Sequence, residues 1–203
     1  MKRIVMMAIL ALALPVAAFA GGVDLGNNGG TLSGSNAGLT LAGSELTSVT
    51  EANGTSIQGA LGSISFTTGS LLSGNLQTGA IFNSGGSFVI TSNGSGGLPG
   101  GTLFTGTFSS DVSWVESSKP CGPNGAVCYT LTGSLSGTWY TGRTLSGETT
   151  QITFSTSKSG FNGSIALASG NTVISTVPEP STLGLLGTGL VGLAGMVRRK
   201  LKV

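Results

Sequence analysis

The sequence contains no histidine and few charged residues, and these absences exclude several kinds of chemistry. Without histidine, the Ser-His-Asp and Cys-His nucleophilic systems cannot be built, and the usual zinc sites are missing as well. Only 8% of the 203 residues are charged. The sequence therefore predicts no metal site, no cofactor and no catalytic residues, and we expect a protein that is not an enzyme.

The few charges are placed unevenly along the chain. Lys2 and Arg3 stand near the start and a basic cluster stands at the end, whereas the part from Gly21 to Thr176 has a formal charge of −3. Its charged residues are Asp24, Glu45, Glu51, Asp111, Glu116, Glu148, Lys119, Arg143 and Lys158. This part has no basic footprint for nucleic acid. Neutral polar residues and 36 glycines dominate instead, as in secreted, matrix-type sequences.

Cysteine is limited to Cys121 and Cys128. The segment between them contains Asn124-Gly125, which is the favoured two-residue turn of a β-hairpin. The spacing does not match the CxxC pattern of redox or metal sites. It predicts a disulfide across a hairpin, which would contribute about 2.5 kcal/mol in the chain-entropy model.

Helical periodicity is absent before residue 177, whereas the alternation of β-strands is frequent. In Val127–Trp139 the apolar side chains occupy odd positions and the hydroxyl side chains occupy even ones, which an extended chain places on opposite faces. Gly133 and Gly137 share the apolar parity and predict a bulge, bend or turn. Further strands are expected at Ile64 with Phe66, Phe88 with Ile90, Phe104 with Phe108, Val112 with Trp114, Ile152 with Phe154, and Ile165 with Leu167.

Short strands at roughly ten-residue intervals predict an all-β fold, as a single antiparallel sandwich or barrel-like domain over residues 63–176. Residues 21–62 are rich in Gly, Ser and Asn with weak periodicity, and we expect them to be weakly structured or to form edge strands. The phrase TLSG and its variants recur in the chain, but their spacing is irregular. A β-solenoid needs a fixed period, so that architecture is the less favoured alternative.

Two residue groups could still support a function outside the classes excluded above. Asp111 and Glu116 are the nearest carboxylates in an apparently folded region, and a glycosidase needs two carboxylates about 5 to 10 Å apart. Their opposite parity favours solvated charges over a catalytic pair. The aromatic residues Trp114, Tyr129, Trp139 and Tyr140 could stack on sugars, but strand parity favours a core position, with Tyr140 the most exposed.

The first 20 residues have the pattern of a secretory signal peptide. Two basic residues precede the apolar run Ile4–Leu14, which is too short to span a bilayer. Ala18 and Ala20 form a small-x-small cleavage site, so we expect signal peptidase to cut after Ala20. The protein is therefore expected to be exported to an oxidising compartment.

The last 27 residues combine three features of different chemistry. The first is the motif Val177, Pro178, Glu179, Pro180, Ser181. Residues 181–197 lack charge and would span roughly 25 Å as a transmembrane helix. The basic tail 198–203, with Arg198, Arg199, Lys200 and Lys202, would stay on the cytoplasmic side.

This order of features resembles the PEP-CTERM sorting signal of Gram-negative bacteria, over residues 177–203 alone. The resemblance implies recognition by an exosortase, cleavage near the motif, and release or onward transfer of the exported part. Such proteins are associated with exopolysaccharide and biofilms. It implies nothing about the role of the residues between the two terminal segments.

Taken together, these patterns predict an exported envelope or matrix protein with a structural or adhesive β domain. Its expected partners are signal peptidase, exosortase, exopolysaccharide and, through the C-terminal helix, the inner membrane, from which the precursor passes to the cell surface or the medium. Two alternatives remain open. One is a secreted, carboxylate-dependent enzyme acting on glycans, and the other is a sugar-binding module held permanently in the membrane.

Overall fold

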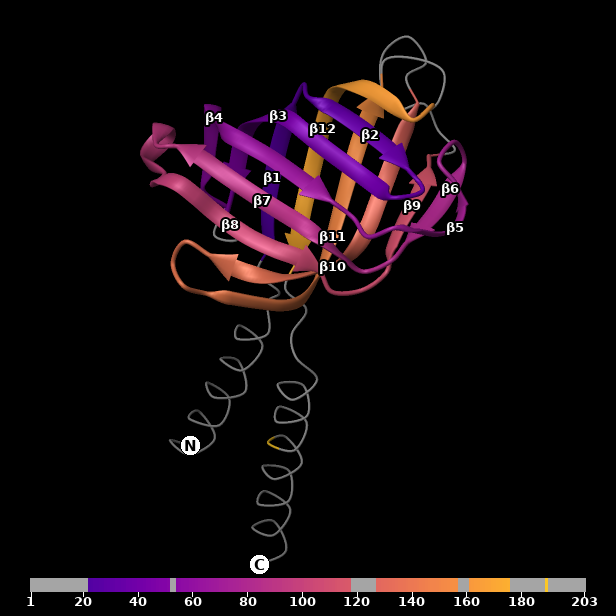
Figure 1. Cartoon of the computed structure of the whole chain (residues 1–203). Coiled ribbons are helices and arrows are strands. Elements are labelled where there is room, and N and C mark those ends of the chain that lie inside the picture. The colour runs from indigo at the N-terminus through magenta and orange to yellow at the C-terminus, as the bar shows by residue number, and fades with distance from the viewer. Residues whose placement is uncertain (1–21, 52–53, 118–126, 157–160, 176–188, 190–203) are drawn as a thin grey trace, which may run out of the picture. The chain divides into compact units, whose positions relative to one another are not determined.

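The computed structural model describes residues 22–51, 54–117, 127–156, 161–175 and 189 (Figure 1). By its internal contacts the chain divides into two units, and Gly22–Thr176 form one of them. All the strand pairings and core contacts given below lie within this segment. The segment thus contains the interactions that hold its sheet together.

The described residues of this segment form twelve strands and one short 3₁₀ turn. They are β1 (Gly22–Asn28), β2 (Thr31–Ser35), β3 (Gly38–Thr50), β4 (Ser56–Thr67), β5 (Leu71–Asn75), β6 (Gly79–Phe82), β7 (Gly85–Asn93), η2 (Ser95–Gly97), β8 (Gly100–Phe108), β9 (Val112–Glu116), β10 (Cys128–Trp139), β11 (Thr144–Thr156) and β12 (Ser164–Ser175). The all-β prediction is confirmed.

Strand β10 forms where the alternation of the sequence is strongest. Tyr129, Leu131 and Leu135 are buried, while hydroxyl side chains of the other parity point away from the core. The predicted irregularity is a bulge, because the pairing of β10 with β11 shifts register between Leu135 and Gly137. The sequence pattern therefore determines both the faces of this strand and the place where it bends.

The strand pairings close on themselves. Every pairing is antiparallel, and the circuit runs β1, β3, β4, β7, β8, β10, β11, β12 and back to β1. The short β2 continues β1 between β12 and β3, and β9 continues β8 beside β10. β6 and β5 branch from β9. Of the two predicted architectures, this arrangement is the barrel-like one (Figure 1).

Aromatic and aliphatic side chains fill the interior of the closed sheet. The ring of Phe66 on β4 lies 5.9 Å from that of Phe154 on β11 and 6.1 Å from that of Phe108 on β8, so distant strands of the circuit meet in one core. The largest fully buried side chains also include Trp114, Tyr129, Phe82, Phe88, Phe104 and Phe161. Each buried side chain of this size stabilises the fold by about 1.5–3 kcal/mol.

The structure corrects the expectation for residues 21–62. The described part of that region forms β1, β2, β3 and most of β4. β1, β3 and β4 belong to the closed circuit, and β2 has a partner on each side, β12 and β3, so none of them is an edge strand. Its leucines, including Leu25, Leu32 and Leu46, are fully buried. No boundary occurs at residue 62, because β4 runs through it without interruption.

Candidate functional site

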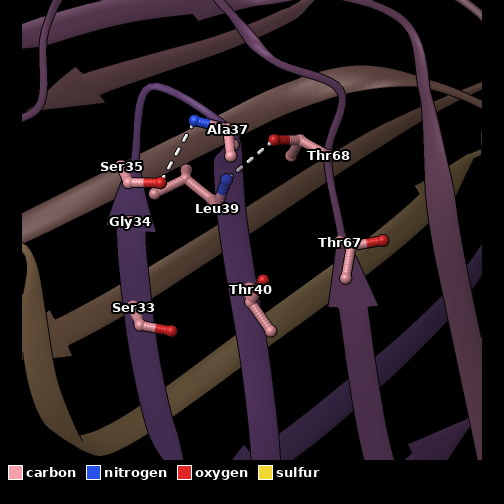
Figure 2. A pocket seen from close by; sticks show the side chains of 9 residues that line it. Ser33, Gly34, Ser35, Ala37, Leu39, Thr40, Thr67 and Thr68 are labelled. Atoms are coloured by element: carbon pink, nitrogen blue, oxygen red, sulfur yellow. Dashed lines mark hydrogen bonds between the residues drawn. The ribbon is translucent and has the colours of Figure 1, made fainter.

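A surface hollow lies where β2, β3 and β4 run side by side (Figure 2). Its volume is about 290 Å³. The residues that line it are Ser33, Gly34, Ser35, Ala37, Gly38, Leu39, Thr40, Thr67 and Thr68. None of these residues carries a charge, and five of them carry a hydroxyl group.

Cross-strand register explains why hydroxyl groups gather at this place. Ser33 of β2 pairs with Thr40 of β3, Thr40 pairs with Thr67 of β4, and Thr67 pairs with Ser87 of β7. Directly paired residues present their side chains on the same face of a sheet. A row of four hydroxyl groups therefore crosses the outer face, and we call it the hydroxyl row.

The end of the hollow is fixed by bonds to the backbone. The N–H of Leu39 donates to Thr68 Oγ1 at 2.9 Å, and that hydroxyl donates to the carbonyl of Gly69 at 2.9 Å. The N–H of Ala37 donates to Ser35 Oγ at 3.1 Å (Figure 2). Gly38 has φ of +127°, and a Cβ there would lie 2.6 Å from the Gly69 oxygen, so only glycine fits.

Two hydroxyl groups of the hollow are available to a ligand. Thr67 Oγ1 is already hydrogen-bonded to Ser87: it lies 3.1 Å from the Ser87 hydroxyl and accepts from the Ser87 N–H at 3.0 Å. Within the described parts of the chain, the hydroxyls of Ser33 and Thr40 have no hydrogen-bond partner, and Figure 2 shows Thr40 on the strand between those of Ser33 and Thr67. Each can donate one hydrogen bond and accept two. The hollow thus suits a neutral ligand with several hydroxyl groups.

The carboxylates Asp111 and Glu116 do not converge. Asp111 is exposed before the start of β9, and Glu116 is the last residue of that strand. At about 3.3 Å per residue, five residues of extended chain place their backbones roughly 16 Å apart. A glycosidase pair needs about 5–10 Å. In the residues that the structure describes, no three His, Cys, Asp or Glu side chains group as a metal site.

The aromatic residues are mainly part of the core, as predicted. The rings of Trp114 and Tyr129 are buried and stack at 4.5 Å. Trp114 Nε1 donates to the carbonyl of Leu76 at 3.0 Å, and Tyr129 OH donates to the carbonyl of Gln77 at 3.1 Å. Burial raises the pKa of Tyr129. Tyr140 is 52% exposed in the turn after β10, in agreement with the sequence prediction.

Only one of the two cysteines of the expected disulfide, Cys128, lies within the described residues. Cys128 is the first residue of β10 and is buried, and no free thiol occurs in the described part of the chain. The ladder of β9 and β10 extends to Ser117, whose N–H donates to the Cys128 carbonyl at 2.7 Å. Cys121 and the Asn124-Gly125 turn lie outside the described residues, so the disulfide stays a prediction.

The residues predicted for processing and sorting also lie outside the described ranges. They are Ala18 and Ala20, the motif Val177 to Ser181, and the basic residues Arg198, Arg199, Lys200 and Lys202. Within the expected spanning segment 181–197, Gly189 is described, and it is helical. None of the helices in the described ranges has the length and apolar character needed to cross a membrane.

The fold and the hollow define an all-β protein with a closed sheet and an uncharged, hydroxyl-lined surface site. A protein-family model described as the PEP-CTERM protein-sorting motif matches residues 176–200. The chain therefore carries this sorting signal, which marks an exported protein of Gram-negative bacteria for processing by an exosortase. The match includes the Val177–Ser181 motif and three of the four predicted basic residues, but not Lys202. No curated protein and no solved structure matches the chain.

Sequence reasoning did not find the hydroxyl row. Ser33 lies in one of the recurring TLSG phrases, which were interpreted as a possible repeat and not as part of a site. A sequence signal did exist, because Ser33, Thr40 and Thr67 each belong to an alternating stretch in which hydroxyl and apolar side chains take turns. The strand register that joins the three stretches could not be inferred from that signal.

Proposed function

We propose that this protein is a structural or adhesive component of the extracellular matrix that binds a neutral polysaccharide through the hydroxyl-lined hollow. The sorting signal supports the destination, because it marks the chain for export and exosortase processing. The composition supports the role, because a weakly charged chain rich in neutral polar residues suits contact with hydrated polymers.

The observation that carries the proposal is the combination of free hydroxyl groups and missing charge in the hollow. Ser33 and Thr40 offer both donors and acceptors, which match the hydroxyl groups of a sugar ring. A charged ligand would meet no opposite charge among the residues that line the hollow. The hollow therefore favours neutral sugars over uronic acids or sulfated sugars.

We also propose that this protein is not an enzyme that cleaves glycans. The position of Asp111 and Glu116 at the two ends of β9, with backbones roughly 16 Å apart, supports it, because a glycosidase needs carboxyl groups about 5–10 Å apart. Incubating neutral and acidic glycans with the segment Gly22–Thr176 and measuring new reducing ends tests this point. Product formation that is lost in an Asp111→Asn, Glu116→Gln variant would support the rival enzyme and contradict the proposal.

Binding is tested with the segment Gly22–Thr176 and the exopolysaccharide of the producing bacterium, separated into neutral and acidic fractions. We expect the neutral fraction to bind, and we expect the Ser33→Ala, Thr40→Val variant to bind at least about tenfold more weakly, because two to four hydrogen bonds are lost. The matched control is Thr130→Val with Thr153→Val, a cross-strand pair on β10 and β11 outside the hollow.

Equal weakening in the control, or no binding of the neutral fraction by the unaltered protein, would contradict the role of the hollow. A preference for the acidic fraction would contradict the ligand class. Deletion of the gene should also leave a matrix that holds less polymer, and a normal matrix would count against a structural role.

We further propose that Cys121 and Cys128 form a disulfide that closes the connection between β9 and β10. Export to an oxidising compartment supports this pairing. Thiol titration of the exported protein without reductant should detect no reactive thiol. Two reactive thiols in the unfolded, unreduced protein would show that the bond is absent.

A further inference from the structure

The hydroxyl row continues beyond the hollow onto strand β12. Ser33 of β2 pairs with Ser164 of β12, and directly paired residues share one face of the sheet. The N–H of Gly34 donates to the carbonyl of Gly163 at 2.8 Å, which holds the start of β12 against β2. Ser164 is exposed, and its hydroxyl has no hydrogen-bond partner within the described ranges. Five neighbouring strands, β12, β2, β3, β4 and β7, therefore each carry one hydroxyl of the same line.

The spacing of this line matches that of an extended sugar chain. Neighbouring strands lie about 4.7–4.9 Å apart, so the line from Ser164 through Ser33 and Thr40 to Thr67 is roughly 14 Å long. An extended chain of hexoses with equatorial linkages advances by close to one strand spacing per unit. Successive units of such a chain therefore meet successive strands.

A second line, which we call the methyl row, runs beside the first. Thr31 of β2 pairs with Ala42 of β3 on one side and with Ala166 of β12 on the other. Each of these residues stands two positions from a hydroxyl of the row on its own strand, so it shares the same face. All three are exposed, and their short side chains end in methyl groups.

The two rows together match the surface of a hexose ring with equatorial substituents. Such a ring carries its hydroxyl groups around the edge and C–H groups on its two faces. A chain lying across the strands places one edge toward the hydroxyl row, where each free hydroxyl can donate one hydrogen bond and accept two. Its C–H faces then rest on the methyl groups of Thr31, Ala42 and Ala166, which bury apolar surface in return.

Charge is almost absent from the strands that the line crosses. β2, β4, β7 and β12 contain no Asp, Glu, Lys or Arg, and β3 contains Glu45 alone, five positions after Thr40. The surface beyond the hollow thus keeps the neutral character of the hollow itself.

We propose that the polysaccharide crosses β12, β2, β3 and β4 at right angles to the strands, that Ser164 is a further contact residue, and that the ligand class is an extended neutral glycan with equatorial linkages. This inference rests on the proposed function, because it takes the hollow to be a polysaccharide site. It adds the direction, the length and the linkage of the bound chain. Three to four sugar units cover the line from Ser164 to Thr67.

A titration of Gly22–Thr176 with β-1,4-linked glucose oligomers, followed by NMR chemical shifts, tests the length and the linkage. The dissociation constant should fall at least about fivefold from the disaccharide to the tetrasaccharide, because the added units reach Ser164 and the methyl row. It should change less than about twofold from the tetrasaccharide to the hexasaccharide. The α-1,4-linked tetrasaccharide of glucose, which coils, should bind at least about fivefold more weakly than its β-linked counterpart.

A single variant tests the added contact. Ser164→Ala should weaken binding of the β-linked tetrasaccharide about threefold or more, through the loss of one hydrogen bond. It should leave the disaccharide, which the hollow holds by itself, within about 1.5-fold, an effect that a general structural change would not produce. Ser169→Ala is the matched control, since Ser169 is also an exposed serine of β12 but lies five positions farther along the strand.

Several results would overturn the inference and leave the proposed function intact. They are equal affinity for the disaccharide and the tetrasaccharide, equal or tighter binding of the α-linked tetrasaccharide, binding of neither tetrasaccharide, or equal effects of Ser164→Ala and Ser169→Ala. The proposed function is judged separately, by binding of the neutral exopolysaccharide and its loss in Ser33→Ala, Thr40→Val. If that polymer itself does not bind, both proposals are wrong.

Discussion

Three buried polar atoms inside the closed sheet have no hydrogen-bond partner among the described residues. They are Asn27 Oδ1, Thr150 Oγ1 and Thr172 Oγ1. Their residues lie on the adjacent strands β1, β11 and β12, since Thr172 pairs with both Leu25 and Ile152. Asn27 satisfies its other end by donating to Ser44 Oγ at 2.6 Å. These three atoms form a polar stripe across β1, β11 and β12, and burying them without a partner costs free energy.

Replacing Thr172 with Val should raise the free energy of unfolding by about 1 kcal/mol, because it removes a buried hydroxyl that gains nothing from folding. Urea denaturation of the Gly22–Thr176 segment measures the change. Thr132→Val, at an exposed position of β10, is the control and should alter stability by less than about 0.5 kcal/mol. A loss of stability in Thr172→Val would show that this hydroxyl has a partner.

The hydroxyl of Tyr129 joins two segments that are distant in the sequence. It donates to the Gln77 carbonyl at 3.1 Å and accepts from the N–H of Phe161 at 2.6 Å. Tyr129→Phe should lower stability by about 1–3 kcal/mol, because both backbone groups lose their partner. Urea denaturation at pH 8 measures this loss, and an unchanged stability would contradict it.

The raised pKa of Tyr129 also predicts a dependence on pH. Burial disfavours the ionised form in the folded protein, so stability is full below pH 10 and falls as the pH rises through the raised value. Denaturation curves from pH 8 to about pH 11 should show this decline, and Tyr129→Phe should reduce it. An equal decline in the variant would assign the effect to other groups.

At the scale of elements, the start of β7 depends on a close approach of two backbones. Gly86 has φ of +70°, and a Cβ there would overlap the carbonyl oxygen of Thr67 on β4. Its neighbour Gly85 has φ of +106° but open space around it. We expect Gly85→Ala to cost about 1–2 kcal/mol for its conformation alone, and Gly86→Ala to cost at least about 2 kcal/mol more. Equal losses in a denaturation experiment would contradict the contact with Thr67.

The predictability of each strand depended on whether its parity is constant. The apolar side chains of β10 keep one parity from Tyr129 to Leu135, and that strand was predicted with both of its faces. In β3 the buried side chains change from odd to even between Leu41 and Leu46, because register shifts interrupt its pairing with β4. A bulge moves the inward face by one residue, so simple alternation could not identify the strand.

The candidate site depended on information that the sequence does not contain. Ser33, Thr40 and Thr67 meet only because β2, β3 and β4 pair in one particular register. A short turn joins β2 to β3, which makes their pairing easy to expect. The pairing of β3 with β4, however, contains two register shifts. The sorting signal, in contrast, was predictable from the sequence, because its residues are contiguous and their recognition does not depend on strand pairing.

At the scale of the whole molecule, the hydroxyl-lined hollow lies in a part of the sheet where no lining residue is charged. Charged contacts weaken with salt, because the Debye length falls from about 10 Å at 0.1 M to about 3 Å at 1 M. We therefore expect the affinity for neutral polysaccharide to change less than about twofold between roughly 0.05 and 0.5 M NaCl. A tenfold loss of binding at high salt would indicate contacts through charged groups such as Arg143.

The sorting signal makes a prediction about the mature protein. Pro178 and Pro180 each disfavour helical geometry in the residue before them, so the sequence predicts an extended stem at the motif, which a peptidase can reach. Mass spectrometry of the form released from the cell should find a C-terminus between Val177 and Ser181. Deleting the exosortase gene should leave the full C-terminal segment attached and the protein in the membrane.

A variant with alanine at Pro178, Glu179 and Pro180 separates recognition of the motif from simple anchoring. It should stay uncleaved in the membrane fraction, whereas a Pro99→Ala variant, altered in the loop between β7 and β8, should be processed normally. Because the predicted helix and basic tail are unchanged in the first variant, its retention can be assigned to the loss of the motif. Release of that variant at the normal rate, or an intact C-terminus on the released protein, would show that the segment acts as something other than a cleavable sorting signal.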